Sequence, residues 1–352
     1  MTSLPPPPSG PQQQQRGNGP TPSNGDKVKW IFGGLAVVLA IALAVVVTVL
    51  IVKPDSENAS VAGTPSGPES DLASTSDTSS VNVITEDSTC DAWGSIGQQL
   101  ATAEESVNWA DRDYRVPATS WSSSQRAMYE TVAKAMTAAA EKTRNLETRT
   151  PHRVLREVYG QFVAYTVRFV DRLPSYVEND DDLAAVVDGL SSALSGICSG
   201  VSSKAAAAVE PLLSEPDEPS SGLAGSSGAD SQLFIERDLP VCAEWESNAK
   251  MFADEVAPWR AIDPNIPYGD WTREQQSVVE EVRPVMSASA DELERLGRRS
   301  GNPVFEDFAV LAAQYRRAFV AALPAYTPRD NSLSATATYL VNSVLWACKA
   351  AS

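Results

Sequence analysis

The chain has 352 residues, with 45 Asp and Glu against 28 Lys and Arg and a formal net charge of -17 at pH 7. This acidic balance argues against nucleic acid as a partner, because phosphate binding needs a basic surface. His152 is the one histidine of the sequence, which leaves almost no material for histidine-based catalytic triads or histidine-rich metal sites.

The N-terminal tail is rich in proline and glutamine. It contains the runs PPPP and QQQQ among Gly, Ser and Asn, without hydrophobic periodicity. Such a segment cannot bury enough apolar surface to offset the entropy lost on ordering. We therefore expect residues 1–29 to form a disordered tail.

An apolar run without charged residues follows, from Trp30 to Val52. At about 1.5 Å per residue, a helix of this length spans a hydrocarbon core of roughly 30 Å. The run is longer than the apolar core of a cleaved signal peptide, which is about 7–15 residues. Lys27 and Lys29 precede it, and the next charged residues after Lys53, from Asp55 to Asp87, are all acidic. The positive-inside rule therefore predicts a single-pass membrane helix over residues 30–52, with a cytoplasmic N-terminus and an extracytoplasmic remainder.

Two segments of similar composition separate the remaining parts of the chain. Residues 53–89 and 199–241 are rich in Ser, Thr, Pro and acidic residues, apart from a short Ala-rich stretch at Lys204 to Val209 that is compatible with an extension of a helix. We expect a solvated acidic stalk over 53–89 and a flexible acidic linker over 199–241.

The two other segments, 90–198 and 242–348, match each other. From Trp121 to Cys198 the sequence aligns without a gap to the stretch from Trp271 to Cys348, at a constant spacing of 150 residues. The segment RFVDRLPSY, which ends at Tyr176, returns as AFVAALPAY, which ends at Tyr326. The sequence therefore predicts an internal duplication with two tandem domains.

Each of these domains is expected to contain four helices. Ser122-x-x-Gln125 and Thr272-x-x-Gln275 match the capping box that begins a helix. The third helix shows one apolar stripe in each copy, comprising Leu155, Val158, Phe162, Tyr165, Phe169 and Leu173, and Phe305, Phe308, Ala312, Tyr315, Phe319 and Leu323. The fourth helix is expected to begin near Asp180 or Asp330. Without an alternating strand pattern of useful length, the fold class is all-α, with two four-helix bundle-like domains behind a membrane helix.

The four cysteines lie at the ends of the two domains. Four cysteines allow three pairings. The first and fourth helices of an up-down bundle have these ends on the same side, and the duplication selects Cys90–Cys198 and Cys242–Cys348. Structural disulfides agree with an extracytoplasmic location, and without a CxxC pair these cysteines are poor candidates for zinc or redox chemistry.

Candidate chemistry is sparse. His152 corresponds to Asn302, so the two copies do not share a base. We interpret the acidic residues of 178–182 and 263–270 as solvated loop acids rather than cation ligands. G-x-S-x-G, P-loop, G-x-G-x-x-G and H-E-x-x-H motifs do not occur in the sequence. We therefore expect no catalytic, metal-binding or cofactor-binding residues and no enzymatic activity.

Four aromatic residues recur where loops meet helix ends: Trp121, Trp271, Tyr176 and Tyr326. Two interpretations remain open. They line a ligand pocket between the helices, or they pack the bundle ends. In the second interpretation we expect the Tyr176 hydroxyl to reach solvent.

The composition of residues 1–90 resembles that of actinobacterial proline-rich, single-pass envelope proteins of unknown function. The resemblance implies a cell-membrane location. Two functions remain open. The first is an interaction or scaffold module that docks another envelope protein. The alternative is an ectodomain that binds or senses a small molecule or lipid in a bundle pocket.

Overall fold

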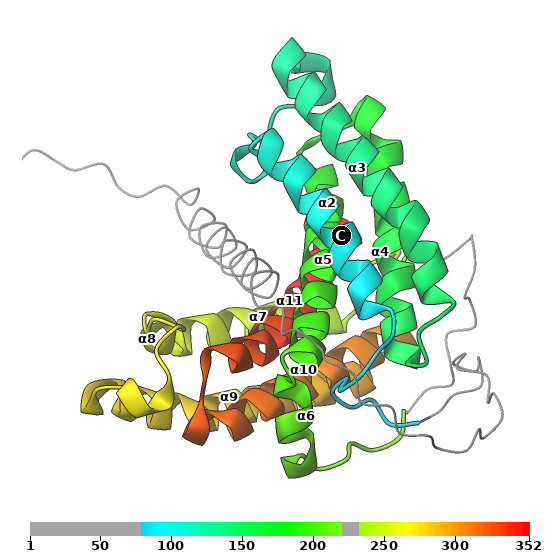
Figure 1. The fold of residues 1–352 in the computed structure, drawn as a ribbon. Helices are drawn as coiled ribbons and strands as arrows, with labels where there is room; N and C mark the ends of the chain where they lie inside the picture. The colour runs from blue at the N-terminus through cyan, green and yellow to red at the C-terminus, as the bar shows by residue number, and fades with distance from the viewer. Residues whose placement is uncertain (1–78, 220–231) are drawn as a thin grey trace, which may run out of the picture. The chain divides into compact units, whose positions relative to one another are not determined.

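The computed structural model describes residues 79–219 and 232–352, which belong to one compact unit (Figure 1). The predicted tail and membrane helix, residues 1–29 and 30–52, lie outside the described residues. Over the described ranges the regular secondary structure is helical, without strands. One stretch there, Glu178–Ser202, is long and apolar enough to cross a membrane, but 72% of its apolar window is buried inside the fold, as expected of a core helix.

The first four long helices, which we call bundle 1, are α2 (Cys90–Ser106), α3 (Ser123–Glu147), α4 (Arg153–Arg172) and α5 (Asp181–Ser202). Short 3-10 turns connect them: η1 (Trp109–Asp111), η2 (Ala118–Ser120), η3 (Leu173–Ser175) and η4 (Glu178–Asp180). This is the predicted number of helices, and the fourth begins at the predicted place.

Bundle 2 has the corresponding elements: α7 (Val241–Glu255), α8 (Ala257–Arg260), η6 (Tyr268–Asp270), α9 (Arg273–Arg299), α10 (Pro303–Ala322), η7 (Leu323–Ala325), η8 (Pro328–Asp330) and α11 (Asn331–Ala350). Between the bundles lie α6 (Ala205–Val209) and η5 (Glu210–Leu212). Below, matched positions are those 150 residues apart.

Local sequence signals explain where the helices begin and which face they bury. Ser122 and Thr272 each form the complete capping box that starts α3 and α9. The predicted apolar stripes of α4 and α10 are buried along almost their whole length. Both stripes end in a leucine followed by proline, where η3 and η7 replace the α-helix because proline cannot continue its hydrogen bonding.

A disulfide closes each bundle. Cys90 pairs with Cys198 and Cys242 with Cys348, with Cα–Cα distances of 5.1 and 5.6 Å. These are the two pairings that the sequence predicts. Each connects the first and the last long helix of its bundle, within the usual Cα–Cα range for disulfides.

The two bundles share a core through α5 and α11, which make the largest helix–helix contact among the described elements. Gly189 and Gly196 allow the close approach. A Cβ at Gly189 would lie 2.6 Å from Ser343 Oγ, and one at Gly196 would lie 2.5 Å from Thr336 Oγ1. The two helices are therefore in contact where larger residues would hold them apart.

The stalk and linker predictions need correction where the structure describes them. Val81, Val83 and Ile84 are buried rather than solvated. In the predicted linker, α5 continues to Ser202, α6 follows, and Phe234 and Ile235 are buried. The average composition of these segments is polar, but a few apolar residues in each are sufficient to attach them to the bundles.

Candidate functional site

The structure brings the predicted aromatic residues of bundle 1 together. Trp121 stacks on Tyr129, with ring centroids 4.1 Å apart, and lies 5.4 Å from Tyr176. The Trp121 indole nitrogen donates to the Val116 carbonyl at 2.9 Å. The rings therefore fill the end of the bundle by contacting one another.

The Tyr176 hydroxyl is not in solvent, contrary to our expectation. It donates to the Tyr114 carbonyl at 2.8 Å and lies 3.1 Å from Asp181 Oδ1. The Tyr176 carbonyl in turn accepts from the Ala118 amide at 2.9 Å. Tyr176 thus connects the loop before α3 to the turn after α4, because both its backbone and its side chain bind that loop.

Bundle 2 repeats this arrangement at matched positions. Trp271 stacks with Tyr326 at 5.4 Å, and its indole donates to the Ile266 carbonyl. The Tyr326 hydroxyl donates to the Pro264 carbonyl at 2.6 Å, and its carbonyl accepts from the Tyr268 amide. The recurring Leu-Pro-x-Tyr therefore performs the same structural task in both bundles.

Sequence reasoning missed a charged cluster beside the aromatic end of bundle 1. Arg112 pairs with Asp181 at 2.9 Å, and its guanidinium lies 3.8 Å from the centroid of the Trp109 ring. Burial raises the pKa of Asp188 to about 6, although Arg112 counteracts this. Burial, and then the charge of Asp188, hold the pKa of Glu104 well above its usual range. The Arg112 guanidinium is therefore the shared counter-ion of Asp181, Asp188 and Glu104, in a region with little access to water.

Bundle 2 does not contain this cluster. The positions matched to Arg112, Asp181 and Asp188 are Ile262, Asn331 and Thr338. The residues of the cluster are far apart in the sequence, so their meeting could not be read from spacing. One signal was present: Asp188 interrupts the otherwise apolar face of α5, and such an acid needs a partner.

A second missed group joins the two bundles. Arg153 of α4 forms a two-pronged ion pair with Asp307 of α10, with distances of 2.9 and 3.0 Å. Both side chains are almost fully buried. Glu157, at the position matched to Asp307, lies in the same group. Burial raises its pKa well above the usual range, and the charge of Asp307 adds to this.

Two segments without helix or strand cross between the bundles. We call residues 79–89 arm 1 and residues 232–240 arm 2. Arm 1 leads into bundle 1, yet its Ile84 amide donates to the Tyr315 hydroxyl of bundle 2 at 3.2 Å. Arm 2 leads into bundle 2, yet its Ile235 carbonyl accepts from the Tyr165 hydroxyl of bundle 1. Tyr165 and Tyr315 are matched residues, so the exchange of arms is reciprocal.

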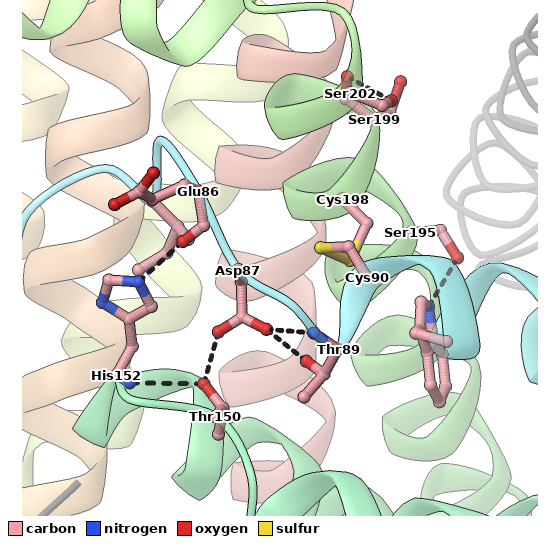
Figure 2. The surroundings of a disulfide bond; sticks show 12 residues. Glu86, Asp87, Thr89, Cys90, Thr150, His152, Ser195, Cys198, Ser199 and Ser202 are labelled. Atoms are coloured by element: carbon pink, nitrogen blue, oxygen red, sulfur yellow. Dashed lines mark hydrogen bonds between the residues drawn. A yellow bond between two sulfur atoms is a disulfide. The ribbon is translucent and has the colours of Figure 1, made fainter. Parts of the chain in front are cut away.

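Figure 2 shows how arm 1 is fixed beside the Cys90–Cys198 disulfide. Asp87 accepts from the Thr89 amide at 2.7 Å and from the Thr150 hydroxyl at 2.6 Å. His152, the N-cap residue of α4, places Nε2 2.8 Å from the Glu86 carbonyl. The matched Asn302 donates to the Phe234 carbonyl of arm 2. His152 therefore has a positional role that an asparagine fulfils in the other bundle.

The loop acids also differ in part from our interpretation. Asp180 and Asp181 are buried, not solvated. Asp180 accepts from the Val177 amide at 2.9 Å, and Asp263 accepts from the Asn265 amide at 2.9 Å. Within residues 79–219 and 232–352, no group of three or more His, Cys, Asp or Glu residues is arranged to hold a metal ion.

An open groove of about 520 Å³ lies on α9 and α10, bordered by residues 212–217. Arg283, Arg317 and Pro324 are among its lining residues. The four predicted aromatic residues are not among them. The groove is therefore distinct from the pocket between the helices that one interpretation of these aromatic residues would require.

Comparison with known proteins identifies relatives but no structural template. The family described as "Mycobacterial ESX-1 associated protein" matches residues 72–352. An uncharacterised protein of Mycolicibacterium smegmatis (strain MKD8) is 39% identical over 337 residues, which cover 94% of this chain and 89% of that protein. No solved structure matches the chain.

Proposed function

Because the chain belongs to the family of mycobacterial ESX-1 associated proteins, we propose that it is a non-catalytic scaffold protein of the cell envelope, which holds components of the ESX-1 secretion system together. In this proposal residues 30–52 anchor it in the membrane by a single helix, and the two bundles are extracytoplasmic. They arose by tandem duplication of one helical unit.

The observation that carries the proposal is the extent of the family match. It begins at residue 72, after the predicted anchor, and continues to residue 352. The relation to ESX-1 that the family's name expresses therefore concerns the helical bundles. Two disulfides support an extracytoplasmic location, as does the charge difference across residues 30–52.

The internal contacts support a scaffold role. The α5–α11 contact, the Arg153–Asp307 ion pair and the crossed arms hold the bundles together. Because the two bundles are held in a fixed arrangement, their surfaces stay at fixed positions, and little conformational entropy is lost when partners bind.

The alternative of a small-molecule or lipid sensor requires space beside Trp121 or Trp271. Both indoles are in contact with neighbouring tyrosine rings and donate to backbone carbonyls. We therefore place the scaffold role first.

Affinity purification tests the proposal. The full-length chain carries a tag in a mycobacterial host, is solubilised gently, and the co-purifying proteins are quantified by mass spectrometry. The matched control retains residues 1–78 and replaces the rest with an unrelated disulfide-bonded domain. We expect components of the ESX-1 system to be enriched at least tenfold over the control. Equal recovery with the control contradicts the proposal.

A further inference from the structure

Bundle 2 contains a buried arginine that has no counter-ion among residues 79–219 and 232–352. Arg316 of α10 is 5% exposed. Burial lowers its pKa to about 9, and no carboxylate counteracts this effect. Two other arginines with buried side chains, Arg112 and Arg153, each pair with an aspartate at 2.9 Å. A charge that is removed from water without a counter-ion is costly, so the pairing of Arg316 is incomplete within the described chain.

The Arg316 side chain lies where three helices of bundle 2, α7, α9 and α10, come together (Figure 1). Its Nη1 donates to Ser289 Oγ of α9 at 2.6 Å, and its guanidinium lies 3.8 Å from the centroid of the Phe252 ring of α7. These contacts fix the guanidinium but use only one of its nitrogens. The Nε and Nη2 atoms form an edge that binds a carboxylate through two parallel hydrogen bonds. In the described part of the chain this edge has no acceptor.

The edge formed by Nε and Nη2 is not sealed in the core. Some polar atoms of the described residues are fully enclosed without a partner, such as Asn248 Nδ2, but Nε and Nη2 of Arg316 are not among them. They therefore border space that a water-sized group can occupy. Phe252, on whose ring the guanidinium lies, is half-buried, so the surface of the bundle is close to this edge.

Bundle 1 shows that the helical unit does not need these groups. The positions matched to Ser289 and Arg316 are Ala139 and Thr166. Thr166 is 1% exposed, and its hydroxyl is fully enclosed. The corresponding region of bundle 1 is therefore uncharged and closed. A cation with an accessible edge is present in bundle 2 alone, although the two copies share the same helical framework.

We propose that Arg316 binds a carboxylate group through Nε and Nη2, at the junction of α7, α9 and α10. A carboxylate carries one negative charge and so balances the one cation. In a region with little access to water, this favours a carboxylate over phosphate or sulfate, which carry more charge. The site is separate from the proposed scaffold function. The carboxylate belongs either to a small free acid or to an acidic side chain of a bound protein, and the experiment distinguishes these sources.

Saturation-transfer NMR with sodium acetate tests the assignment. The full chain is held in deuterated detergent, and acetate replaces chloride at constant ionic strength. We expect saturable transfer to the acetate methyl group with a Kd on the order of 1 mM, as a single charge-assisted pair with a small ligand would give. Sulfate should compete at least tenfold more weakly than formate, and equal competition by sulfate would contradict a carboxylate site.

Three variants make the test specific. Arg316→Thr with Ser289→Ala introduces the residues of bundle 1 at the matched positions, so the fold is expected to persist, which circular dichroism and a non-reducing gel check. This double variant should reduce the transfer at least tenfold. Arg316→Lys keeps the charge but removes the two-nitrogen edge and should weaken binding at least threefold. Arg115→Ala removes an exposed arginine and should leave binding unchanged.

Co-purification of ESX-1 components with the double variant distinguishes the two sources of the carboxylate. If acetate binds the wild-type chain and the double variant loses those components at least tenfold, the carboxylate belongs to a bound protein. If acetate binds and co-purification is unchanged, it belongs to a small free acid. Both results support the site. Transfer that does not saturate with the wild-type chain, or equal transfer with the double variant, overturns the site, whether or not the wild-type chain enriches ESX-1 components.

Discussion

Asp188 and Glu104 lie beside a cation that already pairs with Asp181. A buried carboxylate without its own counter-ion costs free energy, and protonation removes that cost. Since Arg112 is shared by Asp181, Asp188 and Glu104, this cluster contains more carboxyl groups than Arg112 can neutralise. Stability of the folded chain should therefore depend on pH.

The direction in which stability changes with pH follows from the raised pKa of Asp188, which is about 6 in the folded chain. The unfolded chain releases this proton near the ordinary aspartate value of about 3.9. Between these values the folded state binds the proton more tightly, so the free energy of unfolding increases as pH falls through about 6 and levels off below about 4.

Asp188→Asn tests this dependence. We expect the variant to be more stable than wild type by about 1–2 kcal/mol at pH 7.5 and to lose much of the pH dependence. Burial also raises the pKa of Asp182 to about 6, so part of the dependence remains. Urea unfolding of the full chain in detergent, measured by circular dichroism at pH 5 and 7.5, checks the prediction. A variant less stable than wild type at both pH values contradicts it.

A second residue-scale prediction concerns Arg153. Arg153→Ala leaves Asp307 and Glu157 buried without their shared cation and should destabilise the chain by about 3–5 kcal/mol. Arg115 and Asp113 form an exposed pair at 2.9 Å, so Arg115→Ala should cost less than about 1 kcal/mol. Unfolding in urea measures the loss of stability in both variants. Similar losses for the two variants would show that the buried pair has no special role.

At the scale of elements, much of the fold could be predicted from local signals. The capping boxes at Ser122 and Thr272 and the stripes of α4 and α10 depend on residues within one helix, and the structure confirms them. The arms could not be predicted, because their apolar residues are few and their partners, such as Tyr315 for Ile84, lie far away in the sequence.

The α5–α11 contact gives a prediction at this scale. Gly196→Ala places a methyl group 2.5 Å from Thr336 Oγ1, which forces the helices apart and should destabilise the chain by about 1–3 kcal/mol. Gly94 is helical, and a Cβ added there would meet no atom within 4 Å. Gly94→Ala should therefore stabilise by about 0.5–1 kcal/mol through helix propensity alone. Thermal and urea unfolding compare the two, and stabilisation by both contradicts close packing at Gly196.

The crossed arms give a second prediction at the scale of elements. Tyr315→Phe leaves the buried Ile84 amide without its acceptor, at a cost of about 1–3 kcal/mol. Hydrogen exchange of arm 1 should accelerate in this variant. Tyr268→Phe, at an exposed position, is the control and should leave arm 1 unchanged. Equal exchange of arm 1 in both variants and wild type would mean that Tyr315 does not hold it.

At the scale of the whole molecule, two similar helical units and their disulfides could be predicted from the sequence. The prediction that a flexible linker separates the two units was wrong where the structure describes that segment. Gly189 and Gly196 permit the α5–α11 contact, but they correspond to Tyr339 and Trp346 in the other bundle. Because the two copies differ at these positions, a comparison of the repeats did not indicate a close contact between the helices. The apolar character of α5 around most of its circumference was the available signal, since such a helix is normally buried on several sides.

The α5–α11 contact and the crossed arms join the two bundles into one structural body. Native-state hydrogen exchange of the full chain in detergent, followed by mass spectrometry across a urea series, measures whether the bundles unfold together. We predict that the slowest-exchanging amides of α5 and α11 share one opening free energy and one urea dependence. Exchange of α5 at lower urea while α11 stays protected, or the reverse, would show two separate bodies, because each bundle would then unfold on its own.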